Sequence, residues 1–120
     1  MVNPKIKRGS VVLVNFPFTD GSAEKVRPAV VITPDNLLPV MNDILCVFIS
    51  SSKTINLLPT DYILETSNPS FKNTGLLFRS IIRTHKIALL DKMMINRVLG
   101  IIDDILIEDI NYHLKIAVGL

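Results

Sequence analysis

A succession of short β-branched segments, separated by turn-forming residues, constrains the fold of this chain more than any other feature of its sequence. The first segment reads Gly-Ser-Val-Val-Leu-Val-Asn-Phe and the second reads Ala-Val-Val-Ile-Thr. Valine, isoleucine and threonine favour extended backbone, whereas proline, glycine and asparagine favour turns. We therefore expect strands at residues 9–16, 29–33, 43–50, 62–65 and 80–90.

At the end of the chain the spacing of apolar residues changes to that of a helix. Asp103 or Asp104 can cap its first turn, and Lys115 lies near its end. The apolar positions, three or four residues apart, are Leu106, Ile110, Leu114 and Ala117. Short strands and one terminal helix, without strand–helix alternation, favour a small curled sheet or barrel. The expected fold class is mainly β with a C-terminal helix, in a single domain over residues 1–120.

The composition indicates an apolar protein that associates with a second chain. Hydrophobic residues make up 48% of the sequence and charged residues 20%, so we expect part of the apolar surface to be covered by another chain in an oligomer. No apolar run reaches the roughly 18 residues of a membrane span, and the first residues lack a signal peptide's apolar region. We expect a cytoplasmic protein that does not bind a membrane.

The single cysteine and the arrangement of charge limit the kinds of site that this chain can form. Cys46 lies in an apolar run without a disulfide partner or a Cys/His cluster, so we expect a buried thiol and neither a metal nor another cofactor. The net charge of +2 is too small to establish a polyanionic partner. A polyanion binds where positive charge is clustered, whatever the net charge. Basic residues cluster at 5–8, 25–27 and 79–86, whereas acidic residues cluster at 103–109.

The first third of the chain carries a resemblance to a known family. The string Arg8-Gly9-Ser10-Val11-Val12-Leu13-Val14-Asn15-Phe16-Pro17-Phe18-Thr19-Asp20, followed by Arg27-Pro28-Ala29-Val30-Val31-Ile32, resembles the opening of the PemK/MazF-like toxins. In that family a strand leads through a loop, here 19–26, to an Arg-Pro pair that closes it. The later landmarks that resemble the family are Val47-Phe48-Ile49-Ser50-Ser51, Gly75-Leu76, Ser80, Leu90-Asp91-Lys92 and Val98-Leu99-Gly100.

The resemblance implies a fold, an activity and two partners. The fold is an SH3-like small barrel with a C-terminal helix, usually dimeric. The activity is that of a metal-independent endoribonuclease, an mRNA interferase that cleaves single-stranded RNA as the toxin of a type II toxin–antitoxin pair. A cognate antitoxin would hold the toxin inactive, and DNA binding would occur through the toxin–antitoxin complex.

The chemistry of such an enzyme explains which residue types it needs. RNA is cut when its own 2′-hydroxyl attacks the adjacent phosphate, so the enzyme must move protons and stabilise charge on the phosphorane. Arginine donates bidentate hydrogen bonds to phosphate oxygens, and a serine hydroxyl can add another. The resemblance implies Arg27, Ser50 and Ser51 as catalytic residues. From the residues alone, Arg27 could instead pair with Asp20 or Glu24, and the serines could satisfy turn backbone.

Further residues are candidates for contacts with the RNA. They are Thr19, Asp20, Lys25, Lys53, Arg79, Arg83, His85 and Lys86. The basic ones could follow a phosphate backbone, although a solvated basic face is an equally good interpretation of each. His85 and Lys86 stand where many family members have Glu-Gln or Asp-Gln, so substrate preference can differ here.

Two other functions fit the same barrel. One is a non-catalytic toxin that inhibits a protein target such as DNA gyrase, and the other is a plain RNA-binding barrel. Arg27 and Ser50 favour the nuclease.

Overall fold

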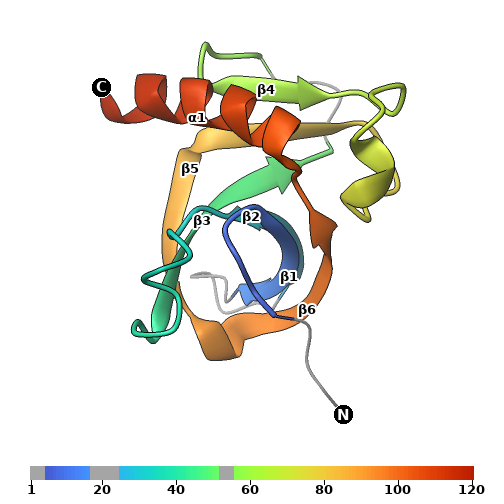
Figure 1. The fold of residues 1–120 in the computed structure, drawn as a ribbon. Helices are drawn as coiled ribbons and strands as arrows, with labels where there is room; N and C mark the ends of the chain where they lie inside the picture. Colours follow the sequence, from blue (N-terminus) through green and yellow to red (C-terminus); the bar gives the residue numbers. More distant parts are fainter. Residues whose placement is uncertain (1–4, 17–24, 52–55) are drawn as a thin grey trace.

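The computed structural model describes residues 5–16, 25–51 and 56–120. Within these ranges six strands form one antiparallel sheet in the order β4-β5-β3-β2-β1-β6, and the sheet curls on itself beneath a single helix, α1 (Figure 1). The strands are β1 (Ser10–Phe16), β2 (Lys25–Val31), β3 (Asp43–Ser50), β4 (Asp61–Leu64), β5 (Ser80–Asp91) and β6 (Ile95–Ile101). The helix α1 covers Asp104–Val118, and two 3₁₀ turns cover η1 (Phe71–Asn73) and η2 (Lys92–Met94). The predicted fold class, mainly β with a C-terminal helix, is confirmed.

The structure corrects the expected bounds of the second strand. Strand β2 begins at Lys25, so Arg27 and Pro28 lie within it rather than closing the loop before it. Proline lacks a backbone N–H and is confined to positions where no ladder bond is needed. The pairing of β2 with β3 accordingly ends at Ala29, while β2 remains paired with β1 as far as Lys25. The rest of the expected 19–26 loop lies outside the described residues.

Strand β6 was not expected from the sequence. Its residues Asn96, Arg97 and Gly100 interrupt the apolar alternation by which a strand is recognised. Two irregularities in its pairing with β1, between Val11 and Val12 and between Leu13 and Val14, shift the register. A bulged strand loses its strict period of two, so the pattern is not visible before the partner strand is known.

Alternating residues of the strands supply two apolar cores, one on each face of the curled sheet. Val30, Val47 and Ile82 belong to the core beneath α1, which contributes Leu106 and Ile110. The core on the other face contains Val12, Val14, Ala29, Val31, Ile44 and Cys46. Cys46 is buried, as expected, and burial raises the pKa of its thiol to about 12. The thiol is therefore protonated at neutral pH.

Capping and one arginine fix the position of α1. The side chain of Asp103 accepts a hydrogen bond from the backbone N–H of Leu106 at 3.1 Å, which confirms the expected N-cap. Arg8 donates to the carbonyl of Ile32 at 3.1 Å and to the side chain of Asn111 at 2.6 Å. Arg8 thus joins the sheet to the helix.

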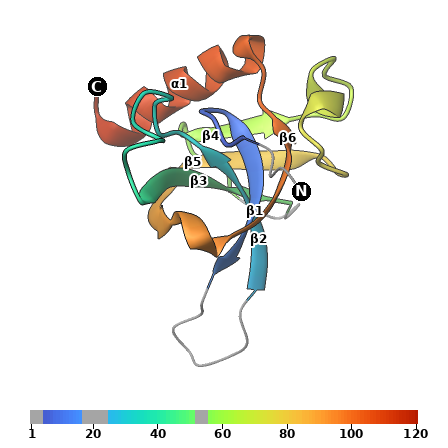
Figure 2. The same ribbon diagram turned by 60° about the horizontal axis from the view of Figure 1, so that its bottom comes forward.

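Figure 2 shows β1 and β2 side by side, extending away from α1. In the described ranges, no helix is both long and apolar enough to span a bilayer.

Candidate functional site

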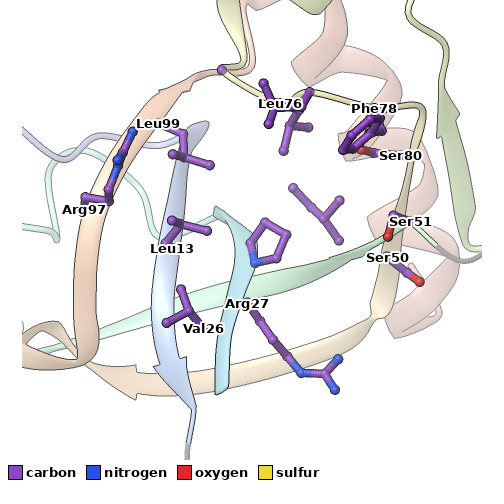
Figure 3. Close-up of a pocket in the computed structure, with 14 residues that line it drawn as sticks. Leu13, Val26, Arg27, Ser50, Ser51, Leu76, Phe78, Ser80, Arg97 and Leu99 are labelled. Atoms are coloured by element: carbon purple, nitrogen blue, oxygen red, sulfur yellow. Dashed lines mark hydrogen bonds between the residues drawn. The ribbon is translucent and has the colours of Figure 1, made fainter. Parts of the chain in front are cut away.

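A cavity of about 660 Å³ lies where β1, β2, β3 and β6 meet the segment 75–80 (Figure 3). Its described lining consists of Leu13, Val26, Arg27, Pro28, Ile49, Ser50, Ser51, Gly75, Leu76, Leu77, Phe78, Ser80, Arg97 and Leu99. The two charged residues among them are both arginines. The cavity therefore combines an apolar surface with positive charge.

Strand register determines which lining side chains point the same way. Leu13 lies opposite Pro28 on β2 and opposite Arg97 on β6. Side chains directly opposite one another in an antiparallel pair lie on one face of the sheet. Leu13, Pro28 and Arg97 therefore face the cavity together.

Arg27 and Ser50 lie where β2 and β3 cease to pair. Ala29 lies opposite Phe48 in the last pair of the two strands, and Arg27 and Ser50 each lie two residues beyond it along their own strands. Because side chains alternate, Arg27 points away from the face of Pro28. Figure 3 shows the Arg27 side chain at the end of β2, extending toward the side of the cavity on which Ser50 and Ser51 lie. A guanidinium and two hydroxyl-bearing residues thus meet at one rim.

The opposite wall is a segment packed tightly against β6. A Cβ on Gly75 would lie 2.2 Å from the carbonyl oxygen of Leu99, and one on Gly100 would lie 2.3 Å from that of Asn73. Gly75 also has a φ of +73°, a conformation that side chains disfavour. The two glycines therefore let the segment cross β6 closely enough to form the wall.

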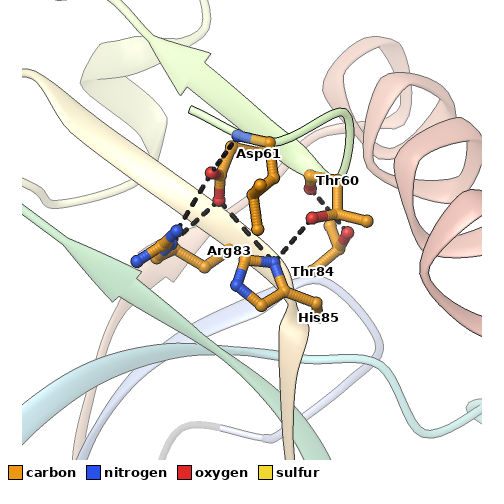
Figure 4. A network of polar contacts seen from close by, with 6 residues as sticks. Thr60, Asp61, Arg83, Thr84 and His85 are labelled. Atoms are coloured by element: carbon orange, nitrogen blue, oxygen red, sulfur yellow. Dashed lines mark hydrogen bonds and ion pairs between the residues drawn. The ribbon is translucent and has the colours of Figure 1, made fainter. Parts of the chain in front are cut away.

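A second polar group lies outside the cavity lining, on β4 and β5 (Figure 4). The buried carboxylate of Asp61 accepts hydrogen bonds from Arg83 at 2.9 and 3.2 Å and from the backbone N–H of Leu58 at 2.9 Å. His85 Nδ1 lies 2.6 Å from the Thr60 hydroxyl and 3.9 Å from Asp61 Oδ1. Arg83 and His85 are thus held by neighbours on β4 and the turn before it.

The pKa of Asp61 reflects a balance between burial and pairing. Burial by itself would raise this pKa, because it disfavours the charged carboxylate. The hydrogen bonds from Arg83 and Leu58, together with the positive charge of Arg83, outweigh burial and lower the pKa below its ordinary value. Asp61 is therefore ionised at neutral pH and holds Arg83 in place through this ion pair.

Comparison with known proteins identifies the family. The family of PemK-like, MazF-like toxins of type II toxin–antitoxin systems matches residues 7–118. The chain belongs to this family. The resemblance read from the Arg-Pro pair and the later landmarks is confirmed, and the protein is a PemK/MazF-like toxin. No curated protein shows significant sequence similarity to the chain.

Solved structures share the fold of this toxin. An endoribonuclease in complex with its cognate antitoxin from a mycobacterial species is 18% identical, with a TM-score of 0.77 and 97% of each chain covered. The Mycobacterium tuberculosis toxin MazF-mt6 is 16% identical, with a TM-score of 0.72 over 92% of this chain and 97% of that one. A MazE-MazF complex from Deinococcus radiodurans is 16% identical, with a TM-score of 0.72 over 96% and 97%. At these identities the likeness concerns the barrel alone.

The structure brings some of the predicted site residues of the toxin together and separates others. Arg27, Ser50 and Ser51, predicted to be catalytic, all line the cavity. Four predicted RNA contacts do not line it: Arg79, Arg83, His85 and Lys86. Arg79 pairs with Glu65 at the surface, and Lys86 is exposed. Thr19, Asp20, Lys53 and the side chain of Lys25 lie outside the described part of the chain, and the roles of all these residues stay predictions.

Two features of the cavity were missed in the sequence. Arg97 belongs to the unexpected strand β6, and Leu77 and Phe78 lie in a segment interpreted only as a loop. The usable signal was the pair of adjacent large apolar residues in a loop, because such residues are normally buried or part of a binding surface.

Within residues 5–16, 25–51 and 56–120, no three His, Cys, Asp or Glu side chains are grouped as metal ligands. Metal independence stays a prediction.

Proposed function

We propose that this PemK/MazF-like toxin is an endoribonuclease that cleaves single-stranded RNA through attack by the substrate's own 2′-hydroxyl, without a metal. The observation that carries the proposal is the meeting of Arg27, Ser50 and Ser51 at one rim of a cavity. Family membership supports it independently.

In this reaction Arg27 binds the scissile phosphate. Its planar guanidinium can donate two hydrogen bonds to the non-bridging oxygens, and it stabilises the negative charge that grows as the 2′-oxygen bonds to phosphorus. The bond from phosphorus to the 5′-oxygen then breaks, which leaves a 2′,3′-cyclic phosphate and a 5′-hydroxyl. The hydroxyl of Ser50 or Ser51 adds a neutral hydrogen bond to the same phosphate.

Proton transfer is a separate requirement. The 2′-hydroxyl must lose a proton, and the leaving 5′-oxygen must gain one. An arginine side chain keeps its proton in proteins and is therefore a poor base, so we assign Arg27 to charge stabilisation rather than to proton removal.

The test uses a modified substrate. An oligonucleotide with one deoxy position 5′ to the scissile phosphate should bind and resist cleavage, because backbone charge supplies most of the affinity. The unmodified RNA should be cut fully in excess chelator, with a cyclic phosphate at the new end. Cleavage at the deoxy position would indicate a water nucleophile, and loss of activity in chelator would indicate a bound ion.

The same assay separates the two alternative functions. A protein-directed toxin would leave RNA intact and would not bind it. A plain RNA-binding barrel would bind the RNA and leave it uncut.

The proposed assembly is a cytoplasmic homodimer whose activity is blocked by a cognate antitoxin. Leu45 on β3 lies opposite Leu89 on β5, and both are exposed, as is Ile87. Leu45 is two residues from Val47, which packs in the core beneath α1, so these residues continue that apolar face of the sheet beyond the core. A second copy of the chain would cover them, and an acidic antitoxin segment would cover the arginine-lined cavity. The antitoxin complex would also supply any DNA binding.

A further inference from the structure

We propose that the wall formed by residues 76–78 is a base-binding subsite, in which Phe78 stacks on one unstacked base beside the cleaved phosphate and Arg97 holds a neighbouring phosphate. This inference rests on the proposed RNA cleavage and adds the residues that hold a base beside the cleaved phosphate.

The first observation is the exposure of two adjacent apolar side chains at the cavity. Leu77 is 80% exposed and Phe78 is 71% exposed, and both line the cavity. An exposed aromatic ring offers a face to any nucleobase, and such stacking strengthens single-strand binding. Figure 3 shows the Phe78 ring at the rim opposite Arg27.

The second observation is that the backbone under Phe78 is held in place. The Thr74 hydroxyl donates to the carbonyl of Phe71 at 2.7 Å and accepts from the backbone N–H of Leu76 at 3.2 Å. After the ring, the buried Ser80 donates to the carbonyl of Phe78 at 2.8 Å. An aromatic side chain on a fixed backbone has only two torsions left to order, so it loses little conformational entropy when it binds.

The third observation is the charge across the cavity from the ring. Arg97 is exposed on β6 and has no ion-pair or hydrogen-bond partner within the described chain. Arg79 and Arg83, by contrast, are paired with Glu65 and Asp61. Leu13 separates Arg97 from Pro28, so the backbone of Arg97 lies about two strand spacings, or about 10 Å, from that of Pro28. Arg27, the residue before Pro28, also lines the cavity.

These features together favour a nucleotide over an apolar peptide. The described lining contains two arginines and neither aspartate nor glutamate, which suits a polyanion. Phosphates at Arg27 and Arg97 would direct the base between them onto the Leu77–Phe78 wall.

The decisive experiment pairs a side-chain change with the removal of one base. Phe78→Leu keeps an apolar side chain without an aromatic face, and Phe78→Trp keeps the face. Abasic sites are placed in turn at each position around the mapped cleavage site. In the wild type one abasic position should lower kcat/KM about tenfold, the size expected for one stacked base.

In Phe78→Leu that abasic position should cause no further loss, whereas Phe78→Trp should restore the sensitivity. Tyr112→Leu is the matched control, because Tyr112 is an exposed aromatic residue on α1, 64% exposed and outside the cavity. It should retain the wild-type response. Equal abasic sensitivity in wild type and Phe78→Leu would overturn the proposal.

The role of Arg97 is tested by the salt dependence of RNA binding. Arg97→Met should lower the slope of log binding constant against log salt concentration by about one, as expected for one lost phosphate contact. Lys115→Met, an exposed cation on α1, should leave the slope unchanged. An unchanged slope in Arg97→Met would remove Arg97 from the subsite.

Failure of the proposed function and failure of the base subsite give different results. If wild-type protein cuts no RNA, the proposed function itself is wrong. If wild-type protein cuts RNA and Phe78→Leu cuts it equally well but binds the antitoxin more weakly, the wall is a protein-binding surface and the base subsite is wrong.

Discussion

At the scale of single residues, Arg27 and Ser50 differ in what they can contribute to the same phosphate. A guanidinium donates charged, bidentate hydrogen bonds, whereas a serine hydroxyl donates one neutral bond. Arg27→Ala should therefore lower kcat by about a hundredfold or more, in line with the loss of a principal charge-stabilising donor. Ser50→Ala should lower kcat by only about tenfold, the equivalent of roughly 1.4 kcal/mol.

The measurement for this pair is single-turnover cleavage of one RNA by both variants, with thermal unfolding as the check on folding. Ser50→Thr keeps the hydroxyl and should retain activity. Equal losses in Arg27→Ala and Ser50→Ala would mean that Ser50 does more than bind phosphate.

The ion pair of Asp61 and Arg83 carries a prediction about stability. Arg83→Met would leave the buried Asp61 carboxylate without its cation, and such a loss destabilises a fold by about 3–5 kcal/mol. The pKa of Asp61 is lowered in the folded protein, so its stabilising contribution is present above the unfolded pKa of about 3.9 and is lost as the pH falls through the folded pKa. Arg83→Met removes the hydrogen bonds and the charge by which Arg83 lowers this pKa, so the pKa of Asp61 should be higher in the variant than in the wild type.

Chemical unfolding at several pH values tests this. The difference in unfolding free energy between wild type and Arg83→Met should be largest near neutral pH and should shrink in acid, as Asp61 becomes protonated in both proteins. A difference that is independent of pH would mean that the Arg83 stem, rather than its charge, stabilises the turn.

At the scale of elements, the sequence predicted the strand and the helix cap that depend on neighbouring residues. It missed the strand that depends on pairing with a distant part of the chain. Strand β3 and the N-cap of α1 follow from their own residues, and both match the structure. Strand β6 depends on a bulged pairing with β1, and the paired residues, from Val14 with Ile95 to Ser10 with Ile101, are 81 to 91 positions apart in the chain. The cavity wall could not be predicted for the same reason, because Phe78 and Arg97 meet Arg27 only after β6 closes the sheet.

The crossing of η1 and β6 gives a prediction at this scale, for which the chain supplies its own control. Gly75 and Gly119 both have positive φ, at +73° and +77°, but a Cβ on Gly75 would meet Leu99 whereas one on Gly119 would meet nothing within 4 Å. Gly119→Ala should lower the free energy of unfolding by about 1 kcal/mol, the penalty for a side chain in left-handed backbone. Gly75→Ala should cost clearly more and should also reduce RNA cleavage, because the Leu77–Phe78 wall would move.

Thermal unfolding and cleavage rates of the two glycine variants should therefore diverge. Equal stability losses would indicate that the 73–75 segment can move away from β6 without cost. In that case the wall is not preorganised, and the base subsite loses one of its supports.

At the scale of the whole molecule, the apolar face of Leu45, Ile87 and Leu89 predicts how the toxin assembles. In a twofold dimer each substitution appears twice at the interface, so Leu89→Glu would bring two carboxylates into an apolar contact and should give a monomer. Leu89 is 59% exposed in the single chain, so the variant should still fold. Ile105→Glu, at a position 75% exposed in the first turn of α1, should remain dimeric, because Ile105 lies on the helix and not on this face of the sheet. It should also fold, because a carboxylate there suits the helix N-terminus. Light scattering at micromolar concentration distinguishes these outcomes, and a wild-type protein that is monomeric under these conditions would contradict the dimer and leave the apolar face unexplained.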